Sequence, residues 1–102
     1  MIHVIATLST APGRRQEVLD AFAELTPKVH AEKGCIEYGA AVDEPTGHPA
    51  QRLVGDDRFM VVEKWESPEA LEAHHSAPHM VAFRDSVGDA LTGVELLVLS
   101  PA

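Results

Sequence analysis

The chain has 102 residues, with eight Lys and Arg against sixteen Asp and Glu and a net charge of -8. A chain of this length is expected to form a single domain, here residues 1–102. The acidic charge argues against binding to nucleic acid or to an anionic membrane surface, because both need basic patches. There is no apolar run of membrane-spanning length, no signal-peptide pattern and only one cysteine, Cys35. We therefore expect a cytoplasmic protein without a disulfide or a cysteine-based zinc site.

The first half of the chain is predicted to contain a strand, a helix and a second strand. Apolar and polar residues alternate over residues 2–9, which indicates a strand. A helix of about residues 14–32 follows, because four apolar residues recur at helical spacing: Val18, Phe22, Leu25 and Val29. Within it Pro27 is expected to cause a local kink, and Gly34 suits the end of the helix. The second strand, residues 35–42, is predicted to place four residues on one face: Ile36, Tyr38, Ala40 and Val42.

A long loop is predicted over residues 43–57, which contain two prolines, two glycines and the pair Asp56-Asp57. A loop of this length in a small domain is often functional, although an ordinary solvated excursion explains it equally well. The next strand, residues 58–65, is predicted to turn four alternate residues to one face: Phe59, Val61, Glu63 and Trp65.

The third strand runs almost directly into a helix. Ser67 is a good N-cap, and Pro68 fits the first helical position. Pro78 is expected to interrupt this helix, because its ring clashes with the carbonyl one turn earlier. Gly93 is expected to stop the helical segment, and residues 94–99 are predicted to form the last strand. Between Pro78 and Gly93 an apolar stripe continues at helical spacing: Met80, Phe83, Val87 and Leu91.

The predicted order is βαββαβ, which is the ferredoxin-like arrangement of the α+β class. Two helices can cover only one face of its four-stranded sheet, so the strands should alternate cleanly between apolar and polar residues. Several strands are instead apolar on both faces, as residues 60–62 and 96–99 show. A second copy of the chain is the simplest cover for the other face. We therefore expect a homodimer with its sheets packed face to face.

No cofactor and no metal site is predicted from motifs. Gly-x-Gly, Cys-x-x-Cys and Gly-x-Ser-x-Gly sequences are all absent. His75 and His79 have the i, i+4 spacing of a helical metal pair, but Pro78 lies between them and disturbs the helix that would align their rings. Cys35 has no histidine or lysine beside it in the sequence, which favours a small buried hydrophobic residue over a reactive thiol.

Two histidines near the expected helix break are candidate general bases. His79 follows Pro78 at a helix start, where the positive end of the helix dipole disfavours an imidazolium and leaves a neutral ring that can accept a proton. His74 lies one turn before Pro78. Either ring also fits a packed, hydrogen-bonded structural histidine. Four further histidines are weaker candidates: His3, His30, His48 and His75.

An apolar pocket is predicted beside these histidines. Trp65 is expected in the core or in the pocket wall, and its indole N–H needs a partner. Glu63 shares its strand face and is a candidate for that partner, because an inward carboxylate must be paired. Four more residues are expected to line the cavity as substrate contacts, although each also fits a plain core position: Phe22, Tyr38, Met80 and Phe83.

Short motifs are spread over nearly the whole chain: Val4-Ile5-Ala6, Pro12-Gly13, Gly34-Cys35 with Tyr38, Glu63-x-Trp65-Glu66-Ser67, Leu71-Glu72-Ala73-His74, Pro78-His79-Met80 and Leu99-x-Pro101. With them the sequence resembles the antibiotic biosynthesis monooxygenase family of dimeric α+β barrels, in particular its bacterial quinol monooxygenase-like members. The resemblance implies oxygenation without flavin or metal, in which an electron-rich phenolate passes an electron directly to dioxygen. Anthrone-oxygenating and haem-degrading relatives use an asparagine, which this chain lacks, and the position of the axial histidine in the haem branch falls near Arg84.

The leading hypothesis is therefore a cofactor-independent monooxygenase that oxidises a quinol or polyhydroxylated aromatic with dioxygen. Trp65 would form the wall of its site, and His74 or His79 would be the base. The alternatives are a non-catalytic dimer that binds a small apolar metabolite and an isomerase of a small carbonyl metabolite. Oxygen consumption with a hydroquinone separates the first hypothesis from the other two.

Overall fold

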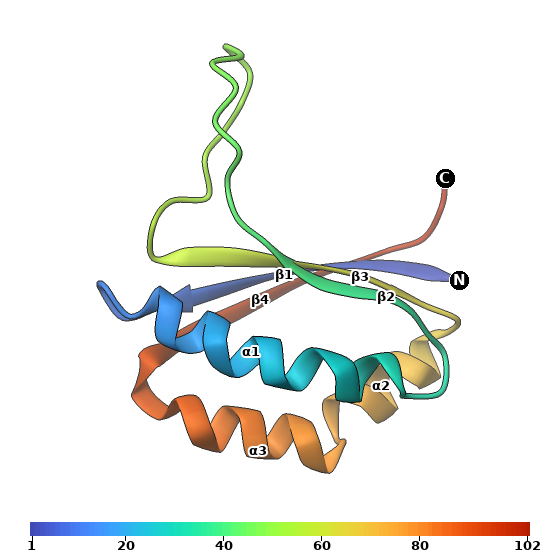
Figure 1. Ribbon diagram of the computed structural model, residues 1–102. Coiled ribbons are helices and arrows are strands. Elements are labelled where there is room, and N and C mark those ends of the chain that lie inside the picture. The colour runs from blue at the N-terminus through green and yellow to red at the C-terminus, as the bar shows by residue number, and fades with distance from the viewer.

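The elements follow the predicted βαββαβ order, with the second helix in two parts (Figure 1). The computed structural model describes residues 1–102. The elements are β1 (Ile2–Thr10), α1 (Arg15–His30), β2 (Cys35–Ala41), β3 (Arg58–Trp65), α2 (Pro68–His75), α3 (Pro78–Val87), a 3-10 turn (Gly88–Ala90) and β4 (Leu91–Leu99). The four strands form one antiparallel sheet in the order β2-β3-β1-β4, and the helices lie together on one of its faces. The ferredoxin-like α+β fold is thus confirmed. None of the helices is both long and apolar enough to cross a membrane.

The core lies between the helices and the sheet. Along β1 every second residue is buried, and along β3 Phe59, Val61, Glu63 and Trp65 are buried in the same way, as the period of two predicts. From the helix side α1 contributes the four residues predicted at helical spacing: Val18, Phe22, Leu25 and Val29. These two patterns bring an amphipathic helix onto the apolar face of the sheet.

The connection from β3 into α2 and α3 has the predicted capping chemistry. The Ser67 hydroxyl accepts a hydrogen bond from the backbone N–H of Ala70 at 3.2 Å, and Pro68 is the first residue of α2. The helix α2 ends at His75, and Pro78 is the first residue of α3, because its ring is compatible with a helix start and not with a helix interior. This break sets the angle between the two segments that carry His74 and His79.

The first helix lies close to its predicted bounds: it begins at Arg15, ends at His30 and contains Pro27. The expected face of the second strand is corrected. In β2 the expected face is not continuous, because the register shifts between Cys35 and Glu37. Ile36 is consequently 53% exposed, while Tyr38 pairs with Glu63 on the helix side of the sheet.

The end of α3 is also corrected. Gly88, which has a φ of 52°, ends this helix in place of Gly93, because a positive φ suits a residue without a side chain. Gly93 lies inside β4, where it pairs with Ser9 of β1. Leu91 is the first residue of β4 and does not continue the apolar stripe of the helix. The last strand is therefore longer at its start than predicted and carries Leu91 and Val94 toward the helices.

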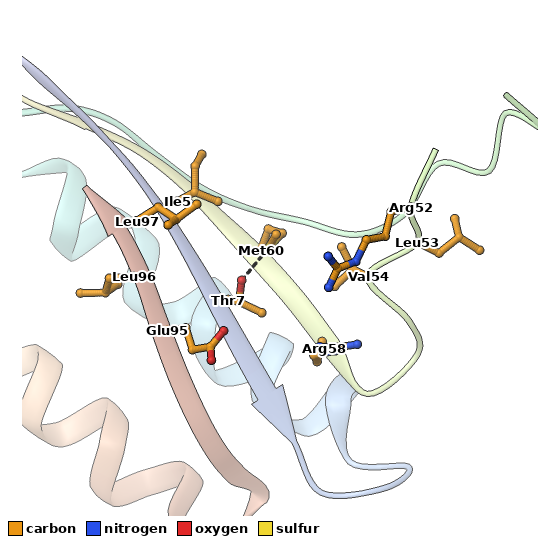
Figure 2. A pocket seen from close by; sticks show the side chains of 10 residues that line it. All are labelled: Ile5, Thr7, Arg52, Leu53, Val54, Arg58, Met60, Glu95, Leu96 and Leu97. Atoms are coloured by element: carbon orange, nitrogen blue, oxygen red, sulfur yellow. Dashed lines mark hydrogen bonds between the residues drawn. The ribbon is translucent and has the colours of Figure 1, made fainter. Parts of the chain in front are cut away.

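The predicted loop forms an arm that extends away from the sheet on the side opposite the helices (Figure 1). At its base the Asp43 carboxylate accepts hydrogen bonds from the backbone N–H groups of Val54 and Gly55, at 2.8 and 2.9 Å. Between the arm and the outer face of the sheet lies an open cavity of about 680 Å³ (Figure 2). Its lining residues are Ile5, Thr7, Arg52, Leu53, Val54, Arg58, Met60, Glu95, Leu96 and Leu97.

The outer face of the sheet is not covered by any helix. Leu97 is 60% exposed, and Val62 and Leu99 are exposed as well. An apolar sheet face of this kind is unusual in a chain that acts alone.

Candidate active site

A second cavity, of about 260 Å³, lies between the helices and the inner face of the sheet. Six of the residues that the sequence singled out line it: Phe22, Tyr38, Glu63, His74, Met80 and Phe83. The other lining residues are Ala6, Leu8, Val61, His75, Arg84, Leu91, Val94 and Leu96. The wall is mainly apolar and aromatic with a few polar groups, which is the usual composition of a small-molecule site.

The aromatic side chains are packed edge to face and stacked around this cavity. Phe22 stacks on Tyr38 with ring centroids 5.3 Å apart, and it meets Phe83 edge-on at 6.0 Å. The Tyr38 ring also meets the His74 imidazole at 5.2 Å. Such contacts fix the ring orientations, so the wall of the cavity is preorganised by α1, β2 and α3.

Both candidate histidines bind one carboxylate, that of Glu32, in the turn between α1 and β2. Nδ1 of His74 lies 2.8 Å from Oε2 of Glu32, and Nε2 of His79 lies 2.7 Å from the same oxygen. Exposure increases along the three side chains, from 2% for His74 through 13% for Glu32 to 22% for His79. The cluster therefore extends from the buried cavity outward to the surface.

The Glu32 contact determines which nitrogen of His74 can act as a base. A carboxylate only accepts hydrogen bonds, so Nδ1 of His74 carries the proton and donates it to Glu32. Nε2 of His74 is then the proton-free nitrogen, and it has no hydrogen-bond partner in the chain. No completely buried side-chain nitrogen or oxygen lacks a partner, so this nitrogen is not fully enclosed by the chain, and the His74 side chain is part of the cavity lining.

The protonation of His74 is governed by its surroundings. Burial lowers its pKa, while the Glu32 carboxylate acts in the opposite direction and the nearby rings of His75 and His79 lower it further. Neutral His74 is therefore favoured near neutral pH. The pKa of His75 is also lowered, first by burial and then by the charge of Arg84.

Glu63 and Trp65 form the hydrogen-bonded pair that the sequence suggested. The indole N–H of Trp65 donates to Oε1 of Glu63 at 2.8 Å, and the Glu63 side chain is buried on the cavity wall. Burial raises the pKa of Glu63 to about 7, because the bond from Trp65 offsets only part of the desolvation and the charge of Glu32 acts in the same direction as burial. Glu63 therefore exists in both protonation states near neutral pH.

The Tyr38 hydroxyl is a second polar group on the wall. Burial raises the pKa of Tyr38, and the charges of Glu63 and Glu32 raise it further. The hydroxyl stays protonated and has no hydrogen-bond partner in the chain, so it is free to donate to a ligand.

The structure separates the remaining predicted residues. Trp65 is completely buried behind the cavity, where its ring lies 4.7 Å from His74, and it supports the wall without lining it. His79 lines a separate groove of about 180 Å³ between α1 and α3. His75, which the sequence ranked as a weaker candidate, lines the cavity. Glu32 was missed, because nothing in its local sequence distinguishes it from the other acidic residues near helix ends.

One group of side chains could in principle hold a metal ion, because its donor atoms lie within 4.8 Å of one another: Glu32, His74 and His79. Two imidazoles and a carboxylate are a donor set that zinc or iron accepts. The Glu32 oxygen stands 2.8 and 2.7 Å from the two ring nitrogens, whereas donors on one tetrahedral ion are roughly 3.4 Å apart. In this arrangement the three side chains form a hydrogen-bonded cluster.

Comparison with known proteins agrees with the resemblance found in the sequence. The family model for antibiotic biosynthesis monooxygenases matches residues 1–86. The chain is 39% identical to the probable quinol monooxygenase YgiN of Escherichia coli K12, over 99% of this chain and 98% of that protein.

Solved structures show the same fold. The protein PA3566 from Pseudomonas aeruginosa superposes with a TM-score of 0.80 at 25% identity, covering 99% of this chain and 93% of that one. Rv0793 from Mycobacterium tuberculosis superposes with a TM-score of 0.78 at 25% identity, covering 99% and 94%. Sequence and fold agree over nearly the whole chain, and the protein belongs to the antibiotic biosynthesis monooxygenase family.

Proposed function

We propose that this protein is a cofactor-independent monooxygenase that oxidises a quinol or another polyhydroxylated aromatic with dioxygen. Family membership supports monooxygenase chemistry, and a relative with 39% identity is named a probable quinol monooxygenase. The observation that carries the proposal is the Glu32–His74 pair, whose imidazole lines an aromatic cavity and has one nitrogen without a partner in the chain. This chemistry needs a base, an apolar pocket for the ring and protection of the anion from water.

His74 is the proposed base. Its Nε2 takes the proton from a substrate hydroxyl, and Glu32 stabilises the imidazolium that results through the Nδ1–H bond. This division of roles is that of the carboxylate and histidine in a hydrolase triad, in which the acid orients the ring and stabilises its charge. His79 remains a positioning residue, because it contacts Glu32 and lines the outer groove instead of the cavity.

The deprotonated substrate then reacts with dioxygen directly. The aromatic anion gives one electron to dioxygen, and the resulting radical pair combines to form a carbon–oxygen bond. Loss of water from the peroxide leaves one oxygen atom on the ring, and the proton on His74 returns to the departing oxygen. In balance, a hydroquinone and dioxygen give a hydroxyquinone and water.

Two further groups are proposed to hold the anion. Tyr38 offers a protonated hydroxyl, and Glu63 in its protonated form offers a second donor. Both side chains are almost fully buried, so their hydrogen bonds to a phenolate oxygen act in a medium of low polarity and are correspondingly strong. Trp65 positions Glu63 from behind.

We also propose that the protein is a homodimer in which two sheets pack through their outer faces. Support comes from the uncovered apolar side chains of Val62, Leu97 and Leu99. The cavity beneath the arm lies on the same face; its lining is mainly apolar and also includes Arg52 and Glu95 (Figure 2). A second copy would remove this surface from water.

The proposed reaction is tested by mixing hydroquinones prepared without oxygen with the protein in aerated buffer. We expect oxygen consumption above the rate of spontaneous oxidation and, with labelled dioxygen, one labelled atom in the product. Replacing His74→Ala should lower turnover roughly a hundredfold or more, the usual effect of losing a general base. The exposed arm residue His48 supplies the control, because His48→Ala should leave the rate unchanged.

Two results would contradict this proposal. The first is that no hydroquinone of one, two or three rings is oxidised faster with the protein than without it. The second is that the folded His74→Ala protein turns over a true substrate at the wild-type rate.

A further inference from the structure

The cavity has a buried end and an open side. Glu63, His74 and Tyr38 are almost fully buried, whereas Arg84, Val94 and Leu96 on the same cavity are exposed. A ligand that fills the cavity therefore presents one end to the acid–base groups and the other to the solvent side, where α3 and β4 meet the opening.

Arg84 is the one lysine or arginine among the lining residues. It lies on α3, and Nη2 donates a single hydrogen bond, at 3.3 Å, to the backbone carbonyl of His75. No aspartate or glutamate lies within ion-pair distance of it, although the chain has sixteen acidic residues against eight basic ones. Most of its five N–H donors are consequently free for a partner outside the chain.

The buried part of the cavity lining carries a group of the other sign. Glu63 is a carboxyl group at the buried end and is partly ionised near neutral pH, so it repels a second carboxylate. Arg84 attracts one at the open side, and the guanidinium fork matches a carboxylate with two parallel hydrogen bonds. The two charges give an amphipathic ligand a single favourable orientation.

We propose that Arg84 selects aromatic ligands that carry a carboxylate, and that the substrates of this site are hydroxylated aromatic carboxylic acids. The ring lies in the apolar cavity, the hydroxyl groups face His74 and Tyr38, and the carboxylate pairs with Arg84 at the opening. The reactive part of this assignment rests on the proposed function, whereas the preference for a carboxylate concerns binding alone.

Binding is measured first, with ligands that cannot be oxidised by this chemistry. 2-Naphthoate and 2-naphthamide have nearly the same shape and differ in charge. By calorimetry we expect the wild-type protein to bind the naphthoate at least about tenfold more tightly, the scale of one charge-assisted contact near a surface. Arg84→Met should remove this difference, Arg84→Lys should retain part of it, and affinity for the amide should change less than about twofold.

Arg58→Met provides a matched control. Arg58 also lacks an acidic partner, but it lines the cavity on the outer face of the sheet. Its replacement should leave both affinities unchanged. Equal binding of the two ligands to the wild type, equal weakening of both by Arg84→Met, or binding of neither would overturn the assignment.

The kinetic arm separates this inference from the proposed reaction. If hydroquinones are oxidised, Arg84→Met should raise KM roughly tenfold for 1,4-dihydroxy-2-naphthoate and leave kcat unchanged, with little effect on 1,4-dihydroxynaphthalene. Oxidation of both substrates with the same KM in both proteins supports the reaction and refutes the role of Arg84. Carboxylate-selective binding without oxidation of any hydroquinone would support the role of Arg84 and refute the proposed reaction.

Discussion

The buried carboxyl group of Glu63 should make the stability of this protein depend on pH in a predictable way. Glu63 is 4% exposed, and the structure raises its pKa from 4.5 to about 7. The replacement Glu63→Gln removes the titration and keeps an oxygen that accepts the indole N–H of Trp65. The difference in stability between the two proteins therefore isolates the cost of ionising this one group.

The sign follows from the number of protons bound in each state. Between pH 4.5 and about 7 the folded protein keeps the Glu63 proton while the unfolded chain has lost it, so the stability of the wild type falls as pH rises. Each pKa unit corresponds to about 1.4 kcal/mol, so the loss is roughly 3 kcal/mol and complete above pH 7. The glutamine variant lacks this loss, and it should gain about 3 kcal/mol relative to the wild type between pH 4.5 and pH 8.

The measurement is urea unfolding of both proteins at a fixed protein concentration across this pH range, followed by the fluorescence of Trp65. The contributions of the other titrating groups cancel when the free energy of unfolding of one protein is subtracted from that of the other. Glu24→Gln is the control, because Glu24 is exposed on α1 and has no hydrogen-bond partner. This variant gives the baseline for the removal of one exposed carboxylate from the same chain.

A flat difference for Glu63→Gln would refute the reasoning, since it would mean that Glu63 ionises at a similar pH in the folded and unfolded chain. A difference of the opposite slope would show that the pKa of Glu63 is lowered and that Trp65 outweighs burial. Either outcome would also remove protonated Glu63 from the proposed mechanism.

Four further predictions concern the site and the assembly. Glu32→Gln should lower kcat by on the order of a hundredfold and change KM little, because the ring of His74 loses its orienting carboxylate; an unchanged kcat in steady-state assays would refute this. The pH profile of kcat/KM should rise through an ionisation below pH 6.5, as His74 becomes neutral, and fall near pH 7 as Glu63 ionises. In Glu63→Gln the falling limb should disappear. Trp65→Phe should chiefly weaken substrate binding, because Glu63 loses its donor, and a fall in kcat without a change in KM would argue against that. Sedimentation should show a dimer at micromolar concentration that Leu97→Glu dissociates, and a stable wild-type monomer would disprove the proposed interface.

The order of the helices and strands could be predicted from the sequence because the patterns that indicate them are local. Alternation along β1 and β3, the cap at Ser67 and the break at Pro78 each depend on residues close together in sequence. The errors occurred where a tertiary contact decided the outcome. The register shift after Cys35 and the pairing of Gly93 with Ser9 are fixed by neighbouring strands, which no short-range pattern reports.

In the candidate site, too, local patterns predicted some residues, and tertiary packing determined the rest. The aromatic wall and the bond between Glu63 and Trp65 follow from the faces of two predicted elements, so the sequence brought these residues together correctly. Glu32 joins His74 across 42 residues and His79 across 47, and it lies in a turn between elements. Its role depends on how α2 and α3 pack beside the end of α1, and that packing angle is not encoded in any motif.

The shared carboxylate also explains why the two histidines, equal as candidates in the sequence, are unequal in the structure. One oxygen of Glu32 accepts a hydrogen bond from each ring, so the two histidines share a single carboxylate. Burial lowers the pKa of His74 and the neighbouring His79 lowers it further, so the neutral ring of His74 is favoured. In the proposed mechanism His79 therefore acts through Glu32, from the more exposed side of the cluster, while His74, which lines the cavity, is the base.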